Sequence, residues 1–123
     1  SSTVKVILIT SDGAKVISGS LDTTIKVWNL EGGDEEFTLE GHSGTIMSLV
    51  LGPWDELLFS QSLDNTIRAW DLRGRAEKFK FDFFCETFGS LAVSPDGKWL
   101  ASTSLKSITI WDIEMKKVEA IFD

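Results

Sequence analysis

A short segment that ends in tryptophan occurs three times along the chain at an almost constant spacing. The copies are residues 18–29, 60–71 and 102–112, and their first serines are 42 residues apart. Each copy joins two alternating apolar stretches through a tight polar turn, a pattern typical of a β-hairpin. A period of about 40 residues indicates a repeat architecture, in which each unit stacks on its neighbours. We therefore expect the whole chain to fold as three similar units.

Each unit is predicted to contain four strands, so the expected fold class is all-β. The expected strands are residues 4–9, 15–20, 24–30, 36–40, 45–51, 57–62, 66–72, 77–81, 87–94, 99–104, 107–113 and 117–122. Nearly every residue of 4–9 is apolar, which favours an inner strand buried on both faces. The more polar stretch 36–40 is typical of an outer edge strand. The sequence therefore predicts three four-stranded antiparallel sheets, over residues 4–40, 45–82 and 87–123.

The three copies resemble the WD40 repeat, which forms one four-stranded blade of a β-propeller. The residues that carry the resemblance are Trp70-Asp71, Trp111-Asp112, the weaker Trp28-Asn29, and Gly41-His42 ahead of the middle copy. The resemblance covers nearly the whole chain and implies an incomplete β-propeller, about half a ring. It also implies a platform for protein–protein interaction with no enzymatic activity of its own.

In this family a His, a Ser, an Asp and the Trp commonly form a hydrogen-bonded chain across the blade. The matching residues here are His42, Ser60, Asp64 and Trp70. Each link has a physical reason, because a buried indole N–H needs an acceptor and a carboxylate can hold a neighbouring imidazole in one tautomer. The resemblance therefore implies a structural network in the middle unit.

The other two units carry incomplete versions of this set. The first unit keeps the Ser, the Asp and the Trp, but its His would precede residue 1. The third unit has Phe84 at the His position and Lys106 at the Asp position, so that only Ser102 and Trp111 remain. We therefore expect the complete network in the middle unit only.

A set of His, Ser and Asp also permits a second interpretation, a hydrolase with Ser60 as the nucleophile and His42 as the base. Two features argue against it: Ser60 lies inside a predicted strand, and no glycine-rich oxyanion turn precedes it. The structural interpretation is preferred, and we expect no enzymatic activity. One histidine and one cysteine, Cys85, do not suffice for a metal site, and no phosphate-binding glycine loop is present, so no cofactor is expected.

Several apolar side chains are candidates for contact with a partner. Trp54 stands at a turn where the other units have Asp, so it either meets a partner or folds back on its own blade. Phe83 and Phe84 replace a Gly-His pair, and they either pack between blades or contact another chain. The family resemblance implies a contact rim at residues 41–44, 83–86, 21–23, 63–65 and 105–106, which includes Leu63 and Asn65.

Charge and cysteine content narrow the kinds of partner and the location. The net charge of −7 disfavours nucleic acid and anionic membranes, because both need a basic surface. No apolar run is long enough to span a membrane. A single cysteine cannot form an internal disulfide, which favours a reducing, intracellular location, cytoplasmic or nuclear.

Three blades cannot close a ring at ordinary sheet spacings of about 10 Å, so one sheet face at each end is expected to be bare. The apolar residues expected there are Val4, Ile25 and Val27 in the first unit and Phe88, Ile108 and Ile110 in the third. Two arrangements would cover these faces. Copies of the chain could associate head to tail as a homo-oligomer, or further blades of a larger propeller could pack on both ends. The second is favoured, as part of a scaffold that binds protein partners.

Overall fold

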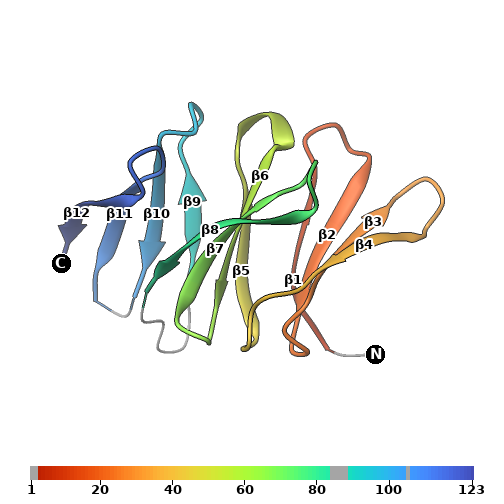
Figure 1. The fold of residues 1–123 in the computed structure, drawn as a ribbon, viewed down its shortest axis with the longest axis horizontal. Helices are drawn as coiled ribbons and strands as arrows, with labels where there is room; N and C mark the ends of the chain where they lie inside the picture. Colours follow the sequence, from red (N-terminus) through yellow and green to blue (C-terminus); the bar gives the residue numbers. More distant parts are fainter. Residues whose placement is uncertain (1–2, 84–88, 105) are drawn as a thin grey trace.

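The computed structural model describes residues 3–83, 89–104 and 106–123 and places them in three four-stranded antiparallel sheets that stand side by side (Figure 1). The strands are β1 (Val4–Ile9), β2 (Lys15–Ser20), β3 (Ile25–Asn29), β4 (Glu35–Leu39), β5 (Ile46–Leu51), β6 (Leu57–Ser62), β7 (Thr66–Asp71), β8 (Ala76–Asp82), β9 (Leu91–Val93), β10 (Trp99–Thr103), β11 (Ile108–Asp112) and β12 (Lys117–Phe122). We refer to the sheets β1–β4, β5–β8 and β9–β12 as blades 1, 2 and 3. The predicted all-β fold class is confirmed.

Within each blade the strands pair in sequence order, so every blade is a meander. The inner strand β5 lies next to β1 on one side and next to β9 on the other. Neighbouring blades therefore meet along their inner edges. Blade 1, which contains the first strand, and blade 3, which contains the last, lie at opposite ends of the row (Figure 1). The row is open, as expected for an incomplete propeller. None of the helices in the described residues is long and apolar enough to cross a membrane.

The turn between the first two strands has a common design in blades 1 and 3. Asp12 and Asp96 each accept a hydrogen bond from a hydroxyl two residues earlier, at 2.6 Å in both cases. The glycine that follows each aspartate has a positive φ, 72° at Gly13 and 74° at Gly97. Glycine suits this position because it has no Cβ to clash in the left-handed region.

Blade 2 has a different turn at the same place, a single 3₁₀ turn η1 (Pro53–Asp55). Asp55 replaces the glycine and still has a positive φ of 55°, beside Trp54 at 62°. The carboxylate of Asp55 accepts hydrogen bonds from the backbone N–H and the hydroxyl of Ser11, at 3.1 and 2.7 Å. This turn therefore links blade 2 to the corresponding turn of blade 1.

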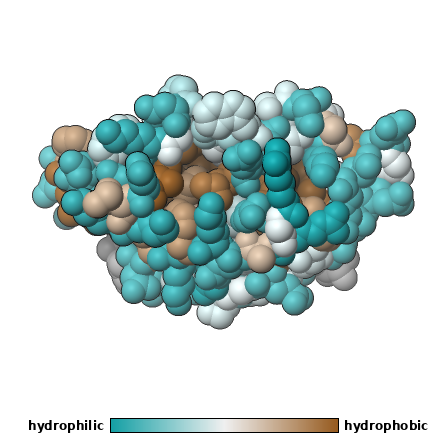
Figure 2. All heavy atoms as spheres, turned by 45° about the horizontal axis from the view of Figure 1, so that its top comes forward, coloured by the Kyte–Doolittle hydropathy of each residue, from teal (hydrophilic) through white to brown (hydrophobic). Residues whose placement is uncertain are grey.

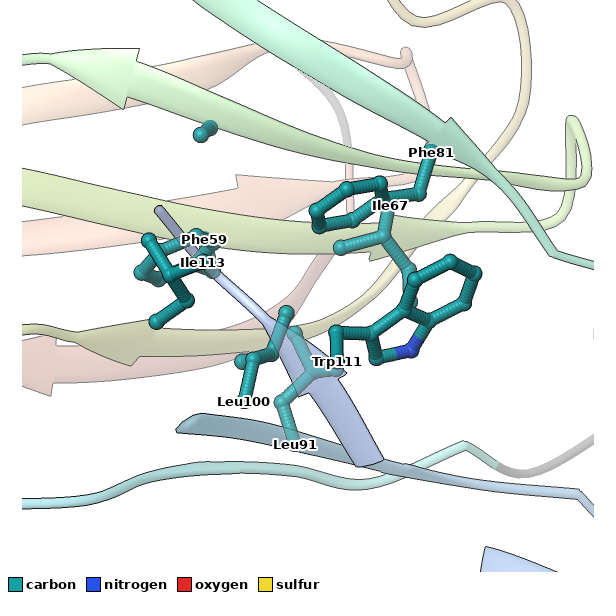
Figure 3. Close-up of a cluster of buried hydrophobic side chains, with 8 residues drawn as sticks. Phe59, Ile67, Phe81, Leu91, Leu100, Trp111 and Ile113 are labelled. Atoms are coloured by element: carbon teal, nitrogen blue, oxygen red, sulfur yellow. The ribbon is translucent and has the colours of Figure 1, made fainter. Parts of the chain in front are cut away.

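Neighbouring blades enclose two separate apolar cores. Between blades 1 and 2, Ile17, Ile25 and Val27 of blade 1 pack against Leu58 and Trp70 of blade 2. Between blades 2 and 3, Figure 3 shows Phe59, Ile67 and Phe81 facing Leu91, Leu100, Trp111 and Ile113. In both cores a blade applies its Trp-bearing face to the preceding blade.

Among the described residues, the stacked pair Phe81 and Trp111 is the closest aromatic contact between blades 2 and 3. Their ring centroids are 4.4 Å apart and their planes differ by only 17°. Phe83 approaches the same indole edge-on at 6.1 Å. Since stacked and edge-on aromatic pairs both stabilise beyond simple area burial, this cluster holds blade 3 against blade 2.

The expectation that residues 4–9 are buried on both faces is wrong. Val6 and Leu8 pack against the core between blades 1 and 2, but Ile7 and Ile9 are 66% and 59% exposed. Successive side chains of a strand point to opposite faces. Among the described residues, blade 1 packs on another blade through one face, which meets blade 2.

The list of end-face residues also needs correction. Ile25 and Val27 were expected on the bare face of blade 1, yet they are fully buried because they point toward blade 2. Val4 is exposed as expected. On blade 3, Ile108 is exposed and Ile110 is half-buried, whereas Phe88 lies outside the described residues.

Candidate functional site

The structure brings His42, Ser60, Asp64 and Trp70 together in blade 2. His42 follows β4, Ser60 is in β6, Asp64 is in the turn between β6 and β7, and Trp70 is in β7. The indole Nε1 of Trp70 donates to the Ser60 hydroxyl at 2.8 Å. The His42 ring lies between its two partners, with Nε2 2.6 Å from Ser60 Oγ and Nδ1 2.8 Å from Asp64 Oδ2.

The donors and acceptors of this network have one consistent direction. Because the Ser60 oxygen already accepts from Trp70, its own O–H donates to Nε2 of His42. That nitrogen is then unprotonated, so the His42 proton is on Nδ1 and is donated to Asp64. A neutral Nδ1–H imidazole satisfies every polar atom along the chain.

The electrostatics of the site favour a neutral imidazole next to an ionised carboxylate. Burial lowers the pKa of His42, and this effect outweighs the opposing influence of Asp64. Burial alone would raise the pKa of Asp64. Hydrogen bonds from Thr66, His42 and the Ser43 backbone N–H more than offset that effect and lower the pKa to about 2.

The same distances resemble the nucleophile, base and carboxylate of a hydrolase, but the surroundings differ from those of a reactive serine. The Ser60 side chain is completely buried and its hydroxyl is engaged by both Trp70 and His42. A nucleophile must reach a substrate carbonyl and needs donors for the developing oxyanion. In this arrangement a substrate has no access to Ser60.

Blades 1 and 3 keep only the Trp–Ser link among the described residues. Trp28 donates to Ser18 at 3.0 Å, and Trp111 donates to Ser102 at 2.9 Å. In blade 1, Asp22 accepts instead from the hydroxyls of Ser20 and Thr24, and these bonds lower its pKa to about 2. In blade 3, Lys106 is exposed, and Phe84, at the His position, lies outside the described residues.

The candidate contact residues fall on different parts of the molecule. Trp54 is 77% exposed in the turn between β5 and β6. Leu63, 42% exposed, and the exposed Asn65 lie in the turn at the other end of β6. Phe83 is half-buried and packs between blades 2 and 3, while Phe84 lies outside the described residues. Thus Trp54 and the pair Leu63 and Asn65 belong to opposite edges of the blade row (Figure 1).

Two grooves between blades were not predicted from the sequence. A cavity of about 360 Å³ opens between blades 1 and 2, and one of about 150 Å³ lies between blades 2 and 3. Both are on the side of the turns that contain Asp12, Trp54 and Asp96, and Figure 2 shows hydrophobic residues in hollows on this side. Residues from separate repeats line each groove, so no local sequence pattern indicates it. Among the described residues, no group of three or more His, Cys, Asp or Glu could hold a metal ion.

Comparison with known proteins gives one family and many solved structures of similar fold. The profile described as "WD domain, G-beta repeat" matches residues 1–29, 33–71 and 86–112. The solved structures of U3-55K and of the RRP9 WD40 repeats superpose with TM-scores of 0.90 and 0.89, each at 19% sequence identity. They cover 98% of this chain, which spans 39% and 38% of theirs.

One protein of known name is similar to this chain over a shorter segment of 51 residues. The chain is 39% identical over 51 residues to the chlorate reductase subunit alpha of Ideonella dechloratans, which is 42% of this chain and 6% of that protein. So small a share of the reductase assigns no activity to this chain.

Proposed function

Because the chain belongs to the WD40-repeat family, we propose that it is a protein–protein interaction scaffold that works with further WD40-type blades at both ends. The observation that carries this proposal is the pair of apolar sheet faces left uncovered on blades 1 and 3. Each face is chemically one half of the interface that joins blades inside the chain.

The outer face of blade 1 matches the face with which blade 2 packs on blade 1. It carries Ile7, Ile9, Val16 and Trp28, which lie on one face because they are cross-strand partners or alternate along a strand. Their counterparts 42 residues later are Leu49, Leu51, Leu58 and Trp70, all part of the core between blades 1 and 2. The outer face of blade 1 therefore suits the opposite face of another blade.

The outer face of blade 3 matches the complementary half. Ile108 pairs with Phe122, and Ile110 pairs with Ala120 and Ala101, so all five share one face. The equivalent residues of blade 2 are Ile67, Phe81, Ala69, Phe79 and Phe59, which pack against blade 3. A blade that presents a tryptophan face, like those of blades 2 and 3, fits here.

The area of these two apolar faces supports the proposal that other blades cover them. Four strands of about five residues span a face of about 300 Å² at standard strand spacings. This is as large as the biggest apolar patch of a typical monomer, and the molecule has two of them. Covering them with blades from a longer propeller also agrees with the larger solved structures, of which this chain spans 39% and 38%.

A second candidate occupant, another copy of this chain, is favoured by a pair of small residues. Arg75 of blade 2 and Lys116 of blade 3 each place their charge over a phenylalanine of the preceding blade, Phe37 and Phe79. Blade 1 has Gly33 at the cation position, and blade 3 has Ala120 at the phenylalanine position. If blade 1 of one copy packed on blade 3 of another, Gly33 would stand opposite Ala120. The cation and the phenylalanine would then both be absent from that contact, so neither would be left without its partner.

Sedimentation of the purified chain tests the proposal. Head-to-tail association predicts a folded species at a multiple of 13.6 kDa. A requirement for foreign blades predicts a chain that aggregates or unfolds alone and becomes soluble when co-expressed with them. A stable, folded 13.6 kDa monomer at all concentrations would contradict both arrangements.

The proposed setting is intracellular, supported by the single cysteine, and the acidic net charge of −7 supports protein rather than nucleic acid or membrane partners. The network of His42, Ser60, Asp64 and Trp70 is proposed to stabilise blade 2 rather than to catalyse a reaction, since Ser60 is fully buried.

A further inference from the structure

The larger groove, between blades 1 and 2, is lined in part by apolar side chains. The half-buried Phe37 and Leu72 provide its accessible apolar surface, and the fully buried Ile17 and Val27 lie behind them. Its volume of about 360 Å³ is at the lower end of the range for ligand pockets and accommodates one or two side chains. The groove can therefore accept an apolar side chain.

The rim of this groove offers cations that are not fully neutralised. Arg75 holds its guanidinium 4.5 Å from the centre of the Phe37 ring, and no carboxylate among the described residues lies within 4.0 Å of it. Arg73 is 85% exposed and reaches Glu56 only at 3.8 Å. Both arginines thus have hydrogen-bond donors free for a ligand.

The acidic residues of the rim are already engaged by groups of the chain itself. Asp12 accepts from the hydroxyl of Thr10 and the backbone N–H of Ala14. Asp55 accepts from the backbone N–H and hydroxyl of Ser11. These carboxylates are engaged within and between their turns, whereas the guanidinium groups of Arg73 and Arg75 are left to bind an anion, although the chain as a whole has a net charge of −7.

The groove between blades 2 and 3 provides an internal comparison. It is smaller, about 150 Å³, and its lining includes Glu56 and Asp96 and no Lys or Arg. The position of Arg73 in the repeat is occupied there by Glu114, so the turn carries one cation, Lys116, instead of two. Of these two grooves, the one between blades 1 and 2 alone combines room for a side chain with a pair of arginines.

We propose that the groove between blades 1 and 2 binds an extended peptide segment of a partner protein in which an apolar residue stands next to an Asp or Glu. The apolar side chain packs on Phe37 and Leu72. The neighbouring carboxylate binds Arg75 and Arg73, since a guanidinium forms strong, directional hydrogen bonds with a carboxylate. This assignment names the partner chemistry of the proposed scaffold and rests on that function.

A binding assay with defined peptide pools tests the inference. The probe is a fluorescein-labelled pool with a central Leu-Glu and randomised flanks, and the control pools replace Glu by Gln or Leu by Ser. We expect saturable binding of the Leu-Glu pool, measured by fluorescence polarisation, and affinity about tenfold weaker for either control pool, as expected for one lost charge-assisted contact or one lost apolar contact.

Matched variants locate the site. Arg75→Met is expected to weaken binding about tenfold, whereas Lys116→Met, the same change at the equivalent turn of blade 3, leaves it unchanged. Arg73→Gln provides a second variant at a highly exposed position, where loss of folding is not expected, and it should weaken binding several-fold. Equal binding of the Leu-Gln pool, or unchanged affinity in both arginine variants, would overturn the inference. So would displacement of the bound pool by an RNA oligonucleotide or by anionic vesicles.

Failure of this inference can be told apart from failure of the proposed function. The assay is run on the chain in its assembled form, with its mass checked by sedimentation in the same sample. An intact assembly that does not bind the Leu-Glu pool refutes the peptide site alone. A stable lone monomer refutes the requirement for further blades, whatever the peptide result.

Discussion

The position of one proton, on Nδ1 of His42, sets the direction of the hydrogen-bonded chain in blade 2. It allows Ser60 to donate to Nε2 and to accept from Trp70 at the same time. Asp64 gathers further donors from Thr66 and from the Ser43 backbone. Removing the carboxylate would leave several buried donors without a partner.

Asp64→Ala is therefore expected to lower the free energy of unfolding by about 1–3 kcal/mol, the cost of leaving a buried donor unsatisfied. Lys106→Ala changes the corresponding position of blade 3, where the side chain is exposed, and should cost less than about 0.5 kcal/mol. Urea denaturation measures both. Equal losses at the two sites would show that the carboxylate contributes nothing special to blade 2.

Acid is expected to destabilise the protein through the same residues. The pKa of His42 is lowered in the folded state, so its contribution is present above its ordinary pKa of 6.5 and is lost as the pH falls through the folded value. Asp64, with a pKa lowered from 3.8 to about 2, adds a second loss as the pH falls between these values.

The measurement is the urea midpoint of wild type and of His42→Gln across the range from about pH 7.5 to about pH 5.5, where the unperturbed imidazole titrates. Wild type should lose stability over this range, and the variant, which has no imidazole, should show a flatter profile. Parallel profiles for the two proteins would mean that His42 does not titrate as its burial requires.

At the scale of elements, contact between blades depends on small residues in the strands as well as on large ones. Gly19 of β2 lies against Ile46 of β5, and a Cβ built at Gly19 would be only 2.5 Å from Ile46 Cγ2 and 2.8 Å from its Cβ. Ile46 is completely buried, so it has no room to move away. The close approach of β2 to β5 therefore requires glycine here.

Gly19→Ala is expected to destabilise the protein by about 1–3 kcal/mol through overpacking of the interface between blades 1 and 2. Gly32→Ala is the control, because its nearest neighbour is the side chain of Asp34, in an exposed turn, which can turn aside. Thermal unfolding of both variants measures the difference. A Gly19→Ala protein as stable as the control would mean that the two blades can separate slightly without cost.

At the scale of the whole molecule, the open row of blades gives two adjacent residues of β12 different surroundings, because they point to opposite faces of blade 3. Phe122 is on the outer face of blade 3, opposite Ile108, whereas Ile121 is on the other face, opposite Thr109. Both side chains are 58% exposed, so they differ in the direction they face rather than in burial. This pair can report on what covers the outer face.

Phe122→Asp is expected to weaken association with the covering blade about tenfold or more, because it places a charge in an apolar interface. Ile121→Asp should have little effect on that association. Sedimentation equilibrium, or capture of co-expressed blades, measures the difference. The same loss for both variants, or none for either, would mean that the outer face of blade 3 is not an interface.

The sequence alone was sufficient to predict the repeat and the strand order. The strand pattern is local, since alternating apolar residues and turn residues within each unit specify a hairpin. His42, Ser60, Asp64 and Trp70 were identified through the family resemblance, and the structure brings them within hydrogen-bonding distance. The tertiary structure decided which side of each strand is covered. Ile7 and Ile25 are equally apolar, and only the position of blade 2 buries one and leaves the other exposed.

The groove and its arginines also depend on the tertiary structure. Arg75 and Phe37 come from different repeats, and they meet only because blade 2 packs on blade 1. Likewise, Asp55 adopts a left-handed turn and binds Ser11 across 44 residues of sequence. Local patterns determine how each blade forms, because its hydrogen bonds join strands that are neighbours in sequence. Contacts between blades depend on side chains distant in sequence, so the packing of whole sheets decides what the surface presents to a partner.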